Sequence, residues 1–251
     1  MARPKISVVT VSLDSAGTIE RTLRSVREQS YPEIEHVVID GGSTDGTVAI
    51  LERHAASLAH WVSERDRGIS HAFNKGVAAA RGELVGILNA DDWYEPGAVE
   101  AIARAYERRP ADVLFGDLAY PELGRVQRGD RRFAEIIPYT MPRLNHPTCF
   151  IRAAAYAAFG GYDERYRIAM DYELLRRFWS RGAAFQYVPQ VIANMSAGGA
   201  SDAHLLRRYA EVLEIASYHP KAFYFVARHR LLRATGRMRA AVSGLVGPRT
   251  P

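Results

Sequence analysis

The first part of the chain alternates short apolar strands with helical patterns, and this alternation limits the folds that it can adopt. Ile6–Val11 and Ile34–Ile39 are rich in β-branched residues, as buried strands are. Apolar side chains at helical spacing follow each strand, over residues 19–26 and 48–51. Two successive strand–loop–helix units are typical of a parallel sheet with right-handed crossovers. We therefore predict an α/β fold with a mostly parallel central sheet flanked by helices.

The same alternation continues through most of the chain. With 251 residues and no low-complexity tract, the chain can bury one sizeable core, so we expect one domain over residues 1–200 and a helical extension over 201–251. Further strands are expected at Trp61–Ser63, Leu84–Leu88, Asp112–Asp117 and Ala183–Val188. Further helices are expected at Ile69–Ala80 and Ala98–Tyr106, before Gly160, and from about Ile168 onward.

An apolar run, Leu84–Leu88, leads directly into the segment Asn89–Asp92, with the sequence NADD. Ligands of α/β sheets bind at the carboxyl ends of strands, so this position predicts a site for a metal or a ribose. Adjacent carboxylates repel each other, and a cation or hydrogen-bond donors would neutralise them. The alternative is that Asp91 and Asp92 only open the helix that follows Pro96.

The second strand ends in Asp40, and the glycine-rich loop 41–47 follows it. The spacing of this loop matches neither the dinucleotide fingerprint nor the phosphate-loop pattern, so we predict neither motif. Asp40 at the strand end can accept hydrogen bonds from a ligand's N–H or hydroxyl group. Alternatively, Asp40 is a turn-forming residue bonded to its own backbone.

The formal charge of +5 is concentrated in the extension, because residues 201–251 hold nine Lys and Arg side chains against three acidic ones. The segment Lys221–Val246 mixes arginines with apolar and aromatic residues and has no acid, which is typical of a helix attached to anionic lipid. Alternatively, its apolar side packs on the core and its arginines are solvated. No nucleic-acid recognition motif accompanies the charge, so nucleic acid is not an expected partner.

Cysteine content and the amino terminus indicate the compartment. Cys149 is the single cysteine, so no intrachain disulfide can form, and we expect it to be a small buried hydrophobe. The amino terminus runs directly into a strand without an apolar signal segment, and no uninterrupted apolar run reaches membrane-spanning length. We therefore expect a cytoplasmic protein, peripheral on the inner face of the plasma membrane if the basic extension binds lipid.

Four motifs follow one another in the first part of the chain: Ile6–Ser12 (ISVVTVS), Val38–Thr47 (VIDGGSTDGT), Asp66–Gly76 (DRGISHAFNKG) and Leu88–Asp92 (LNADD). Each is weak alone, but their combination and order resemble the family 2 glycosyltransferases of the GT-A fold. The resemblance implies a half over residues 1–110 that binds a nucleoside-diphosphate sugar on a parallel sheet. It implies an acceptor half over residues 111–200.

The resemblance also implies roles for single residues. The nucleotide-sugar-binding residues are then Ser12, Asp40, Lys75, Asn89 and Asp91. Within this set Ser12 lies near the base, Asp40 bonds the base, and Asp91 is near the ribose. Asp92 is implied to ligate a divalent metal, Mn²⁺ or Mg²⁺, on the diphosphate. This agrees with the chemistry, because oxygen ligands from the protein and the phosphates suit a hard cation that stabilises an anionic leaving group.

In the second half, the segment Ile168–Phe178 resembles the family's acidic motif at a helix start, where Asp171 acts as the general base. An inverting transfer needs such a base to take the proton of the acceptor hydroxyl as it attacks the anomeric carbon. Alternatively, Asp171 caps the helix and Glu173 is the base, although Glu173 points about 200° around the helix from Asp171. The family often has Glu before this Asp, where this chain has Met170.

Two further segments are candidates for contacts with the diphosphate or the acceptor. His146 either contacts one of them or is a structural histidine in a turn. The glycine-rich loop Asn194–Ser201 is expected to close over bound nucleotide, with Ser201 or His204 reaching phosphate.

These motifs predict an inverting, metal-dependent glycosyltransferase. It would move a hexose from a nucleotide-diphosphate sugar, with UDP favoured, to a hydroxyl of a glycan or lipid-linked acceptor in cell-envelope polysaccharide or glycolipid biosynthesis. Two other functions stay open. A nucleotidyltransferase would need a basic glycine-rich loop early in the chain, which is not seen. A catalytically silent sugar-nucleotide binder would not need both Asp92 and Asp171.

Overall fold

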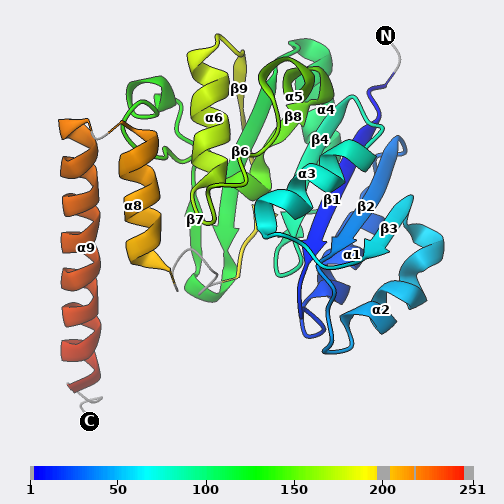
Figure 1. The fold of residues 1–251 in the computed structure, drawn as a ribbon, viewed down its shortest axis with the longest axis horizontal. Coiled ribbons are helices and arrows are strands. Elements are labelled where there is room, and N and C mark those ends of the chain that lie inside the picture. Colours follow the sequence, from blue (N-terminus) through cyan, green and yellow to red (C-terminus); the bar gives the residue numbers. More distant parts are fainter. Residues whose placement is uncertain (1–2, 197–203, 218, 246–251) are drawn as a thin grey trace, which may run out of the picture.

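The computed structural model describes residues 3–196, 204–217 and 219–245, with side chains as far as residue 232. Within this part of the chain, nine strands form one sheet in the order β3-β2-β1-β4-β8-β6-β9-β5, and β7 pairs with β6 beside that path (Figure 1). The strands are β1 (Ile6–Ser12), β2 (Ile34–Asp40), β3 (His60–Ser63), β4 (Leu84–Asn89), β5 (Trp93–Tyr94), β6 (Val113–Tyr120), β7 (Arg125–Gln127), β8 (Phe150–Arg152) and β9 (Phe185–Asn194). The helices are α1 (Ile19–Arg27), α2 (Thr47–His54), α3 (Ile69–Ala79), α4 (Ala98–Arg108), α5 (Ala153–Phe159), α6 (Met170–Ser180), α8 (Leu205–Ile215) and α9 (Pro220–Leu245).

Strands β1 to β4 make the parallel half of the sheet. Ile6 of β1 is in register with Ile34 of β2 and with Leu84 of β4. All seven residues of β1 are buried, since helices cover both faces of a parallel sheet and leave no side for polar residues. The predicted parallel α/β sheet is confirmed.

Two helical layers cover the sheet. On one face, α3, α5, α6 and α8 share an apolar core with the strands. On the other face, α4 and Val26 of α1 share a second core with β1, β4, β6 and β9. Gly76 lets α3 lie directly on β1, because a Cβ atom at this position would be 2.2 Å from the Cγ1 atom of Val9. The α3 segment that carries Asn74 and Lys75 is thereby fixed to the strand that ends in Ser12.

The predicted element bounds differ from the observed ones at short strands and at strand ends. Strands β5 and β8 were not predicted, because segments of two and three residues are too short to show periodicity. Strand β8 enters the sheet antiparallel between β4 and β6. Strand β9 was expected at Ala183–Val188 but continues to Asn194. Its last residues pair with β5 on one side and with β6 on the other.

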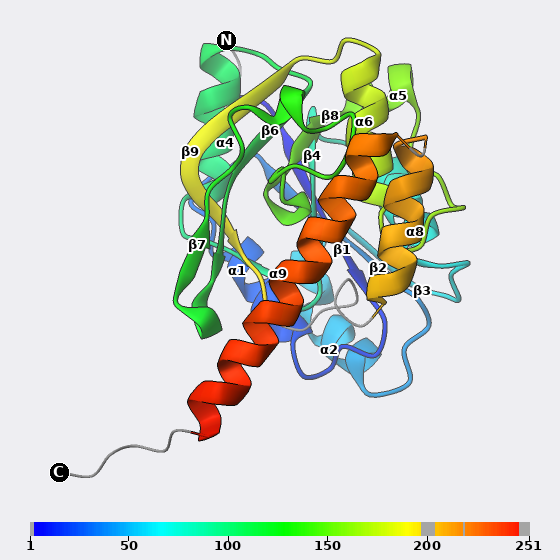
Figure 2. The same cartoon turned by 90° about the vertical axis from the view of Figure 1, so that its left-hand side faces the viewer.

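The extension is helical, as predicted, and at the side of the molecule farthest from β3 α8 lies beside α6 and α9 lies beside α8 (Figure 1). Val212 and Ile215 of α8 belong to the same apolar core as α6. In the view turned by 90°, α9 runs diagonally in front of the sheet with α8 beside it, and its carboxyl end projects away from the sheet (Figure 2). None of the described helices is long and apolar enough to cross a bilayer. The boundary at residue 200 between the domain and the extension stays a prediction. Helix α8 packs on the apolar core of residues 1–200.

Candidate active site

Polar side chains end four neighbouring parallel strands at one edge of the sheet. Ser12 at the end of β1 is in register with Asp40 at the end of β2, and Asp40 is in register with Ser63 at the end of β3. Asn89 ends β4 and is in register with Val11, one residue before Ser12. The carboxyl edge of such a sheet is where ligands bind. The structure therefore brings Ser12, Asp40 and Asn89 to one edge, as expected from the sequence.

Asp40 is fully buried and makes five hydrogen bonds. Its Oδ1 atom accepts from the hydroxyls of Ser12 at 2.8 Å and Ser43 at 2.5 Å. Its Oδ2 atom accepts from Ser63 Oγ at 2.7 Å and from the N–H groups of Gly42 at 3.1 Å and Ser43 at 2.9 Å. Burial opposes ionisation, but the bonds from Ser43, Ser63 and Ser12 outweigh it and hold the pKa of Asp40 below its usual value. Asp40 is thus ionised and holds the loop after β2 in place, which is the turn-forming role considered as the alternative. A hydrogen bond from Asp40 to a nucleotide base stays a prediction.

The Asp91–Asp92 pair does not cap a helix. Helix α4 begins at Ala98 and has Gly97 as its N-cap residue, without a side-chain cap. Asp92 is 1% exposed, and burial, followed by the charge of Asp91, raises its pKa well above the usual value. Asn89 donates to Asp92 Oδ2 at 3.4 Å. The helix-capping alternative for this pair is therefore wrong.

Two buried oxygen atoms of this loop have no hydrogen-bond partner among the described residues: Oδ1 of Asp92 and Oδ1 of Asn89. Oxygen atoms of carboxylates and amides are the ligands that hard divalent cations prefer. The described residues contain no group of three His, Cys, Asp or Glu side chains placed to hold a metal. The residues present therefore fit a cation only if a ligand such as a diphosphate supplies further oxygens.

Helix α1 holds the Asp91–Asp92 loop by its carbonyl groups. Thr22 Oγ1 donates to the carbonyls of Ala90 at 3.0 Å and Asp92 at 2.6 Å. Arg21 donates to the Asp91 carbonyl at 2.9 Å, and its guanidinium lies 3.5 Å from the ring centroid of Trp93. These contacts could not be predicted, because Arg21 and Thr22 lie in an ordinary amphipathic helix.

The same guanidinium reaches the end of β9. Arg21 donates to Ser196 Oγ at 3.0 Å, and Ser196 donates to the Asp91 carbonyl at 2.9 Å. The start of the glycine-rich loop is thus fixed beside the carboxylate pair. Ser201, expected to reach phosphate, lies outside the described residues, whereas His204 is exposed and precedes α8.

Lys75 is paired with two carboxylates. Its Nζ atom lies 2.8 Å from Glu64 and 2.9 Å from Asp66, and Asp66 also contacts His71 Nδ1 at 3.1 Å. Partial burial opposes the charge of Lys75, but the bonds to Glu64 and Asp66 outweigh it and raise its pKa. A Cβ atom at Gly41 would meet Asp66 Oδ2 at 3.3 Å, so this cluster lies against the loop after β2. Lys75 therefore lies at the site but is already neutralised, and its contact with a nucleotide sugar stays a prediction.

Helix α3 also contacts the segment before α6. The Asn74 amide donates to the carbonyl of Tyr162 at 2.9 Å and accepts its N–H at 2.8 Å. Ser70 donates to the carbonyl of Tyr166 at 2.9 Å. A Cβ atom at Gly161 would come within 2.5 Å of Asn74 Oδ1. The segment Asp66–Gly76 (DRGISHAFNKG) thus contacts the segment before α6 and also carries residues beside the candidate site.

His146 lies in a short 3-10 helix, His146–Thr148, and is half-buried. Its Nε2 atom is 2.8 Å from the hydroxyl of Tyr162, and its ring centroid is 5.1 Å from that of Phe73. Loss of solvent lowers the pKa of His146 to about 4, so the ring is neutral at pH 7. A neutral imidazole can hydrogen-bond a diphosphate or an acceptor but brings no positive charge to it. Both the contact and the purely structural role stay open.

Asp171 is in the first turn of α6 and is half-buried. Loss of solvent raises its pKa to about 6, although the N–H of Tyr172 donates to Asp171 Oδ1 at 2.7 Å and stabilises the charge. The N-cap residue of α6 is Ala169, so Asp171 is not the helix cap. Glu173 is held by Arg177 in a two-point ion pair at 2.8 and 2.9 Å. Of the two carboxylates considered as base, Asp171 is the one not committed to an ion pair among the described residues.

The two carboxylates Asp92 and Asp171 belong to one region of the molecule. The Tyr94 hydroxyl is within electrostatic range of both Asp92 and Cys149. Cys149 is in turn within electrostatic range of Asp171. Cys149 is 3% exposed and burial raises its pKa, so it is a buried thiol as predicted.

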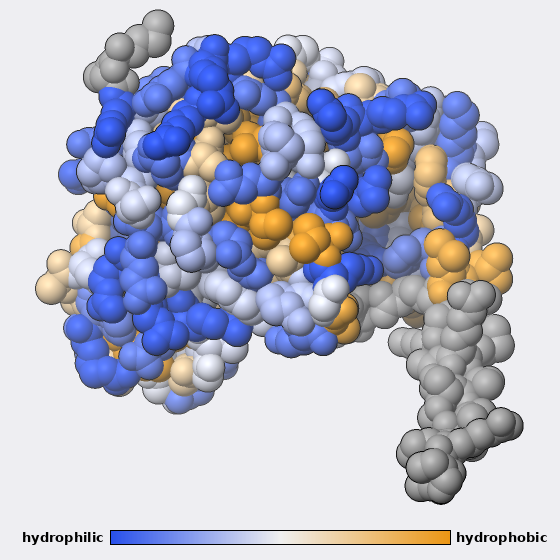
Figure 3. Space-filling model, turned by 180° about the vertical axis from the view of Figure 1, so that it is seen from behind, coloured by the Kyte–Doolittle hydropathy of each residue, from blue (hydrophilic) through white to orange (hydrophobic). Residues whose placement is uncertain are grey.

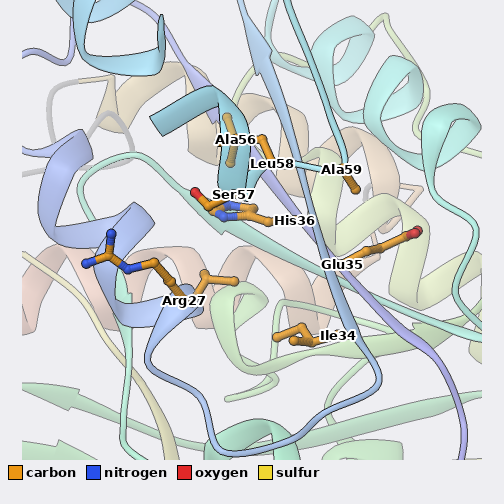
Figure 4. A pocket seen from close by; sticks show the side chains of 9 residues that line it. Arg27, Ile34, Glu35, His36, Ala56, Ser57, Leu58 and Ala59 are labelled. Atoms are coloured by element: carbon orange, nitrogen blue, oxygen red, sulfur yellow. The ribbon is translucent and has the colours of Figure 1, made fainter. Parts of the chain in front are cut away.

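A hollow of about 310 Å³ lies elsewhere, beside the amino-terminal part of β2 (Figure 4). Its lining includes Arg27, Ile34, His36 and Ser57, and Glu35 points away from the His36 ring. None of the residues predicted for the site lines it. Since ligands of parallel sheets bind at the carboxyl ends of the strands, we do not assign the active site to this hollow.

Comparison with known proteins supports the geometry. The sequence model of glycosyl transferase family 2 matches residues 7–164. An uncharacterized glycosyltransferase of Mycobacterium tuberculosis is 34% identical over 182 residues, which cover 69% of this chain and 68% of that protein. A PGL/p-HBAD biosynthesis glycosyltransferase of Mycobacterium bovis is 27% identical over 224 residues, covering 86% of this chain and 87% of that protein.

Solved structures share the fold. S. aureus TarS 1–349 in complex with UDP-GlcNAc has a TM-score of 0.67 at 21% identity, covering 85% of this chain and 66% of that chain. A mannosyltransferase of Pyrobaculum calidifontis in complex with GDP-Man and Mn²⁺ has a TM-score of 0.64 at 22% identity, covering 99% of this chain and 82% of that chain. These likenesses confirm the GT-A architecture. Because the family model matches more than half of its length, the chain belongs to glycosyl transferase family 2.

Proposed function

We propose that this glycosyltransferase is an inverting, metal-dependent enzyme that moves a hexose from a UDP-sugar to a hydroxyl of a glycan or lipid-linked acceptor. The proposal is carried by the oxygens of Asn89 and Asp92, at and just after the end of β4, which lack hydrogen-bond partners among the described residues, and by a separate carboxylate, Asp171, whose pKa is about 6. The relative from Mycobacterium bovis is named for PGL/p-HBAD biosynthesis, which supports a role in glycolipid or polysaccharide biosynthesis.

In this proposal the chain's residues divide the work between donor and acceptor. Asp40 and its hydroxyl partners present a rigid loop for the base, and Asp91 lies beside the ribose. Asp171 accepts the proton of the acceptor hydroxyl as the oxygen attacks the anomeric carbon and the bond to the diphosphate breaks. A base with a pKa near 6 is ionised at pH 7 and still basic enough to assist the attack.

The proposal includes a divalent cation. Oδ1 of Asp92 and Oδ1 of Asn89 are the atoms that would face it, since both lack partners among the described residues. When bound, Mn²⁺ or Mg²⁺ would stabilise the negative charge that develops on the leaving diphosphate. The mannosyltransferase of Pyrobaculum calidifontis, in complex with GDP-Man and Mn²⁺, supports this choice of cofactor.

The donor prediction is tested by thermal unfolding with UDP-GlcNAc, UDP-glucose, UDP-galactose and GDP-mannose, each with Mn²⁺ or with EDTA. A ligand at 100 times its Kd stabilises the native state by about 2.7 kcal/mol. For a domain of this size we expect a rise in Tm of several degrees, about 2–4 °C for each kcal/mol. A UDP-sugar should give the largest shift, and EDTA should remove most of it. If no nucleotide sugar shifts Tm, the proposal fails.

We further propose that α9 attaches the enzyme to an anionic membrane surface. Tyr224 and Leu231 of α9 are 62% and 64% exposed, and apolar surface is visible on the described part of this helix (Figure 3). The alternative is also supported in part, because Ala222 is buried and Val226 packs on the core. The basic side chains of the segment complement anionic lipid.

The membrane proposal is tested by co-sedimentation with phosphatidylglycerol vesicles. Truncation after Tyr218 and the double variant Tyr224→Ser/Leu231→Ser are both expected to weaken binding by about tenfold or more, since they remove apolar surface that would enter the lipid. Donor hydrolysis should be unchanged. Leu123→Ser removes an equally exposed apolar side chain outside the extension, at 58% exposure, and is the matched control. Equal binding by all forms would contradict the membrane proposal.

A further inference from the structure

Three consecutive backbone N–H groups just before α6 converge on one carboxylate from another helix. Glu211 of α8 accepts from Ala169 N at 2.8 Å, from Ile168 N at 2.9 Å, and from Arg167 N at 3.1 and 3.2 Å to its two oxygens. Successive N–H groups of this kind form a concave anion-binding turn. Here the anion is the chain's own Glu211, 42 to 44 residues away along the sequence.

Helix α6 lacks a cap of its own. Its N-cap residue is Ala169, which has no side-chain oxygen to accept the free N–H groups of the first turn. Glu211 is 7% exposed and binds the residues just before the first turn instead, ending with the N–H of the N-cap residue Ala169. Burial opposes its ionisation, but hydrogen bonds from Ala169, Ile168 and Arg207 outweigh it and keep the pKa of Glu211 below its usual value.

Helix α8 is itself fixed on the core. Val212 and Ile215 of α8 lie in the apolar core that includes Met170 and Leu174 of α6. Arg207 holds the other side of Glu211 at 2.8 Å. The carboxylate therefore has a defined position, and Asp171 is only two residues beyond the last N–H group that it holds.

We propose that Glu211 is a positioning residue of the transferase, which fixes the first turn of α6 and so aims Asp171 at the acceptor hydroxyl. This inference rests on the proposed function, because it takes Asp171 as the base. It assigns a catalytic task to the first helix of the extension, which the family motifs do not reach. Loss of the Glu211 carboxylate leaves three N–H groups without this acceptor, of which that of Ala169 is buried, and the first turn of α6 then moves.

Several charged or titratable groups lie near Asp171 and affect the expected pH profile. Arg208 of α8 lowers the pKa of Asp171, and Glu211 raises it. Cys149 and Tyr162 lie within electrostatic range, but burial raises the pKa of each, so neither changes charge near pH 6. Removal of the Glu211 charge should therefore shift the acidic limb of the pH profile to lower pH.

The test compares Glu211→Gln and Glu211→Asp with Glu214→Gln in the full-length protein. Glu214 is on the same helix and accepts only the Tyr166 hydroxyl, at 3.2 Å, among the contacts described, which makes it a matched control. The measured quantities are UDP release from UDP-GlcNAc with Mn²⁺, the pH profile of kcat, and amide hydrogen exchange across residues 166–175. The wild type and Asp171→Asn are measured in parallel.

We expect Glu211→Gln to lower kcat at least tenfold with KM for the donor within twofold of wild type, because a small displacement of a reacting group is costly. Its pH profile should shift to lower pH, and exchange across 166–175 should be faster. Glu211→Asp keeps the charge but shortens the reach, so kcat should fall without the pH shift. Glu214→Gln should match wild type within twofold.

The outcomes separate this inference from the proposed function. If Asp171→Asn abolishes turnover while Glu211→Gln leaves kcat and the pH profile unchanged, Glu211 is not a positioning residue. If both Glu211 variants fail to fold, the role of Glu211 is structural alone and the inference is overturned. If Asp171→Asn keeps wild-type turnover, the assignment of the base itself fails, and the inference fails with it.

Discussion

Replacement of Asp171 by Asn is expected to reduce donor turnover by about 10²–10⁴-fold, which is the usual contribution of a general base. Asn has nearly the same shape but cannot accept the acceptor's proton. Nucleotide binding should be retained, because Asp40 and Asn89 end β2 and β4 and Asp92 lies between β4 and β5, away from α6. The measurement is UDP release with UDP-GlcNAc and Mn²⁺, beside calorimetric binding of UDP.

The same variant should be more stable than wild type at pH 7. The pKa of Asp171 is raised from 3.8 to about 6, so its ionised form is disfavoured in the folded state. The stability that comes from the protonated form is present below pH 3.8 and is lost as the pH rises through about 6. Asn has no charge to bury, so Tm at pH 7 should rise. Glu173→Gln, which breaks the pair with Arg177, is the control and should lower Tm. Wild-type turnover in Asp171→Asn, or loss of UDP binding by Asp171→Asn, would contradict the role of Asp171 as the base.

Replacement of Asp92 by Asn is expected to have opposite effects on stability and on metal response. Without metal, burial of Asp92 beside Asp91 raises its pKa well above the usual value, so ionisation of Asp92 destabilises the fold as the pH rises. Asp92→Asn should therefore raise Tm at pH 7 in EDTA. With Mn²⁺ and a UDP-sugar, wild type should gain several degrees, whereas the variant should gain little, because a neutral amide is a weaker ligand for a hard cation. Donor turnover should fall by two orders of magnitude or more.

The control for this variant is Asp117→Asn. Asp117 is also buried, at 8% exposure, and binds the N–H of Gly129 at 2.8 Å and the hydroxyl of Tyr187 at 2.7 Å. It lies on β6 and has no contact with the strand-end site among the described residues. Its substitution should leave the Mn²⁺ response unchanged. A full Mn²⁺ response in Asp92→Asn would show that the metal, if bound, is held elsewhere.

The parallel half of the fold could be predicted because β1, β2 and β4 are runs of six or seven residues rich in apolar and β-branched side chains, separated by helices with regular apolar spacing. A run such as Leu84–Asn89 is buried on both faces, and its composition shows this directly. Strand β8 could not be predicted in the same way. Its three residues join the sheet antiparallel through register with β4, and that pairing depends on contacts far apart in the sequence.

The candidate site, too, could be predicted only in part. The strand-end position of Asp40 and Asn89 could be predicted from where the apolar runs end, and both lie at that edge. The partners of these residues could not be predicted. Ser63 bonds Asp40 from 23 residues away, and Arg21 holds the Asp91 carbonyl from 70 residues away. Such contacts depend on the packing of α1 on the sheet and on the pairing of β3 with β2, and neither can be predicted from a local sequence pattern.

The most direct test of the central claim is the anomeric configuration of the sugar first released when the enzyme hydrolyses an α-linked UDP-sugar. Proton NMR in the first minutes, before the free sugar interconverts, resolves the two anomers. A single displacement assisted by Asp171 predicts the β anomer from wild type and loss of release in Asp171→Asn. The α anomer as first product would contradict direct attack from the face opposite the diphosphate, and with it the proposed role of Asp171 as the base.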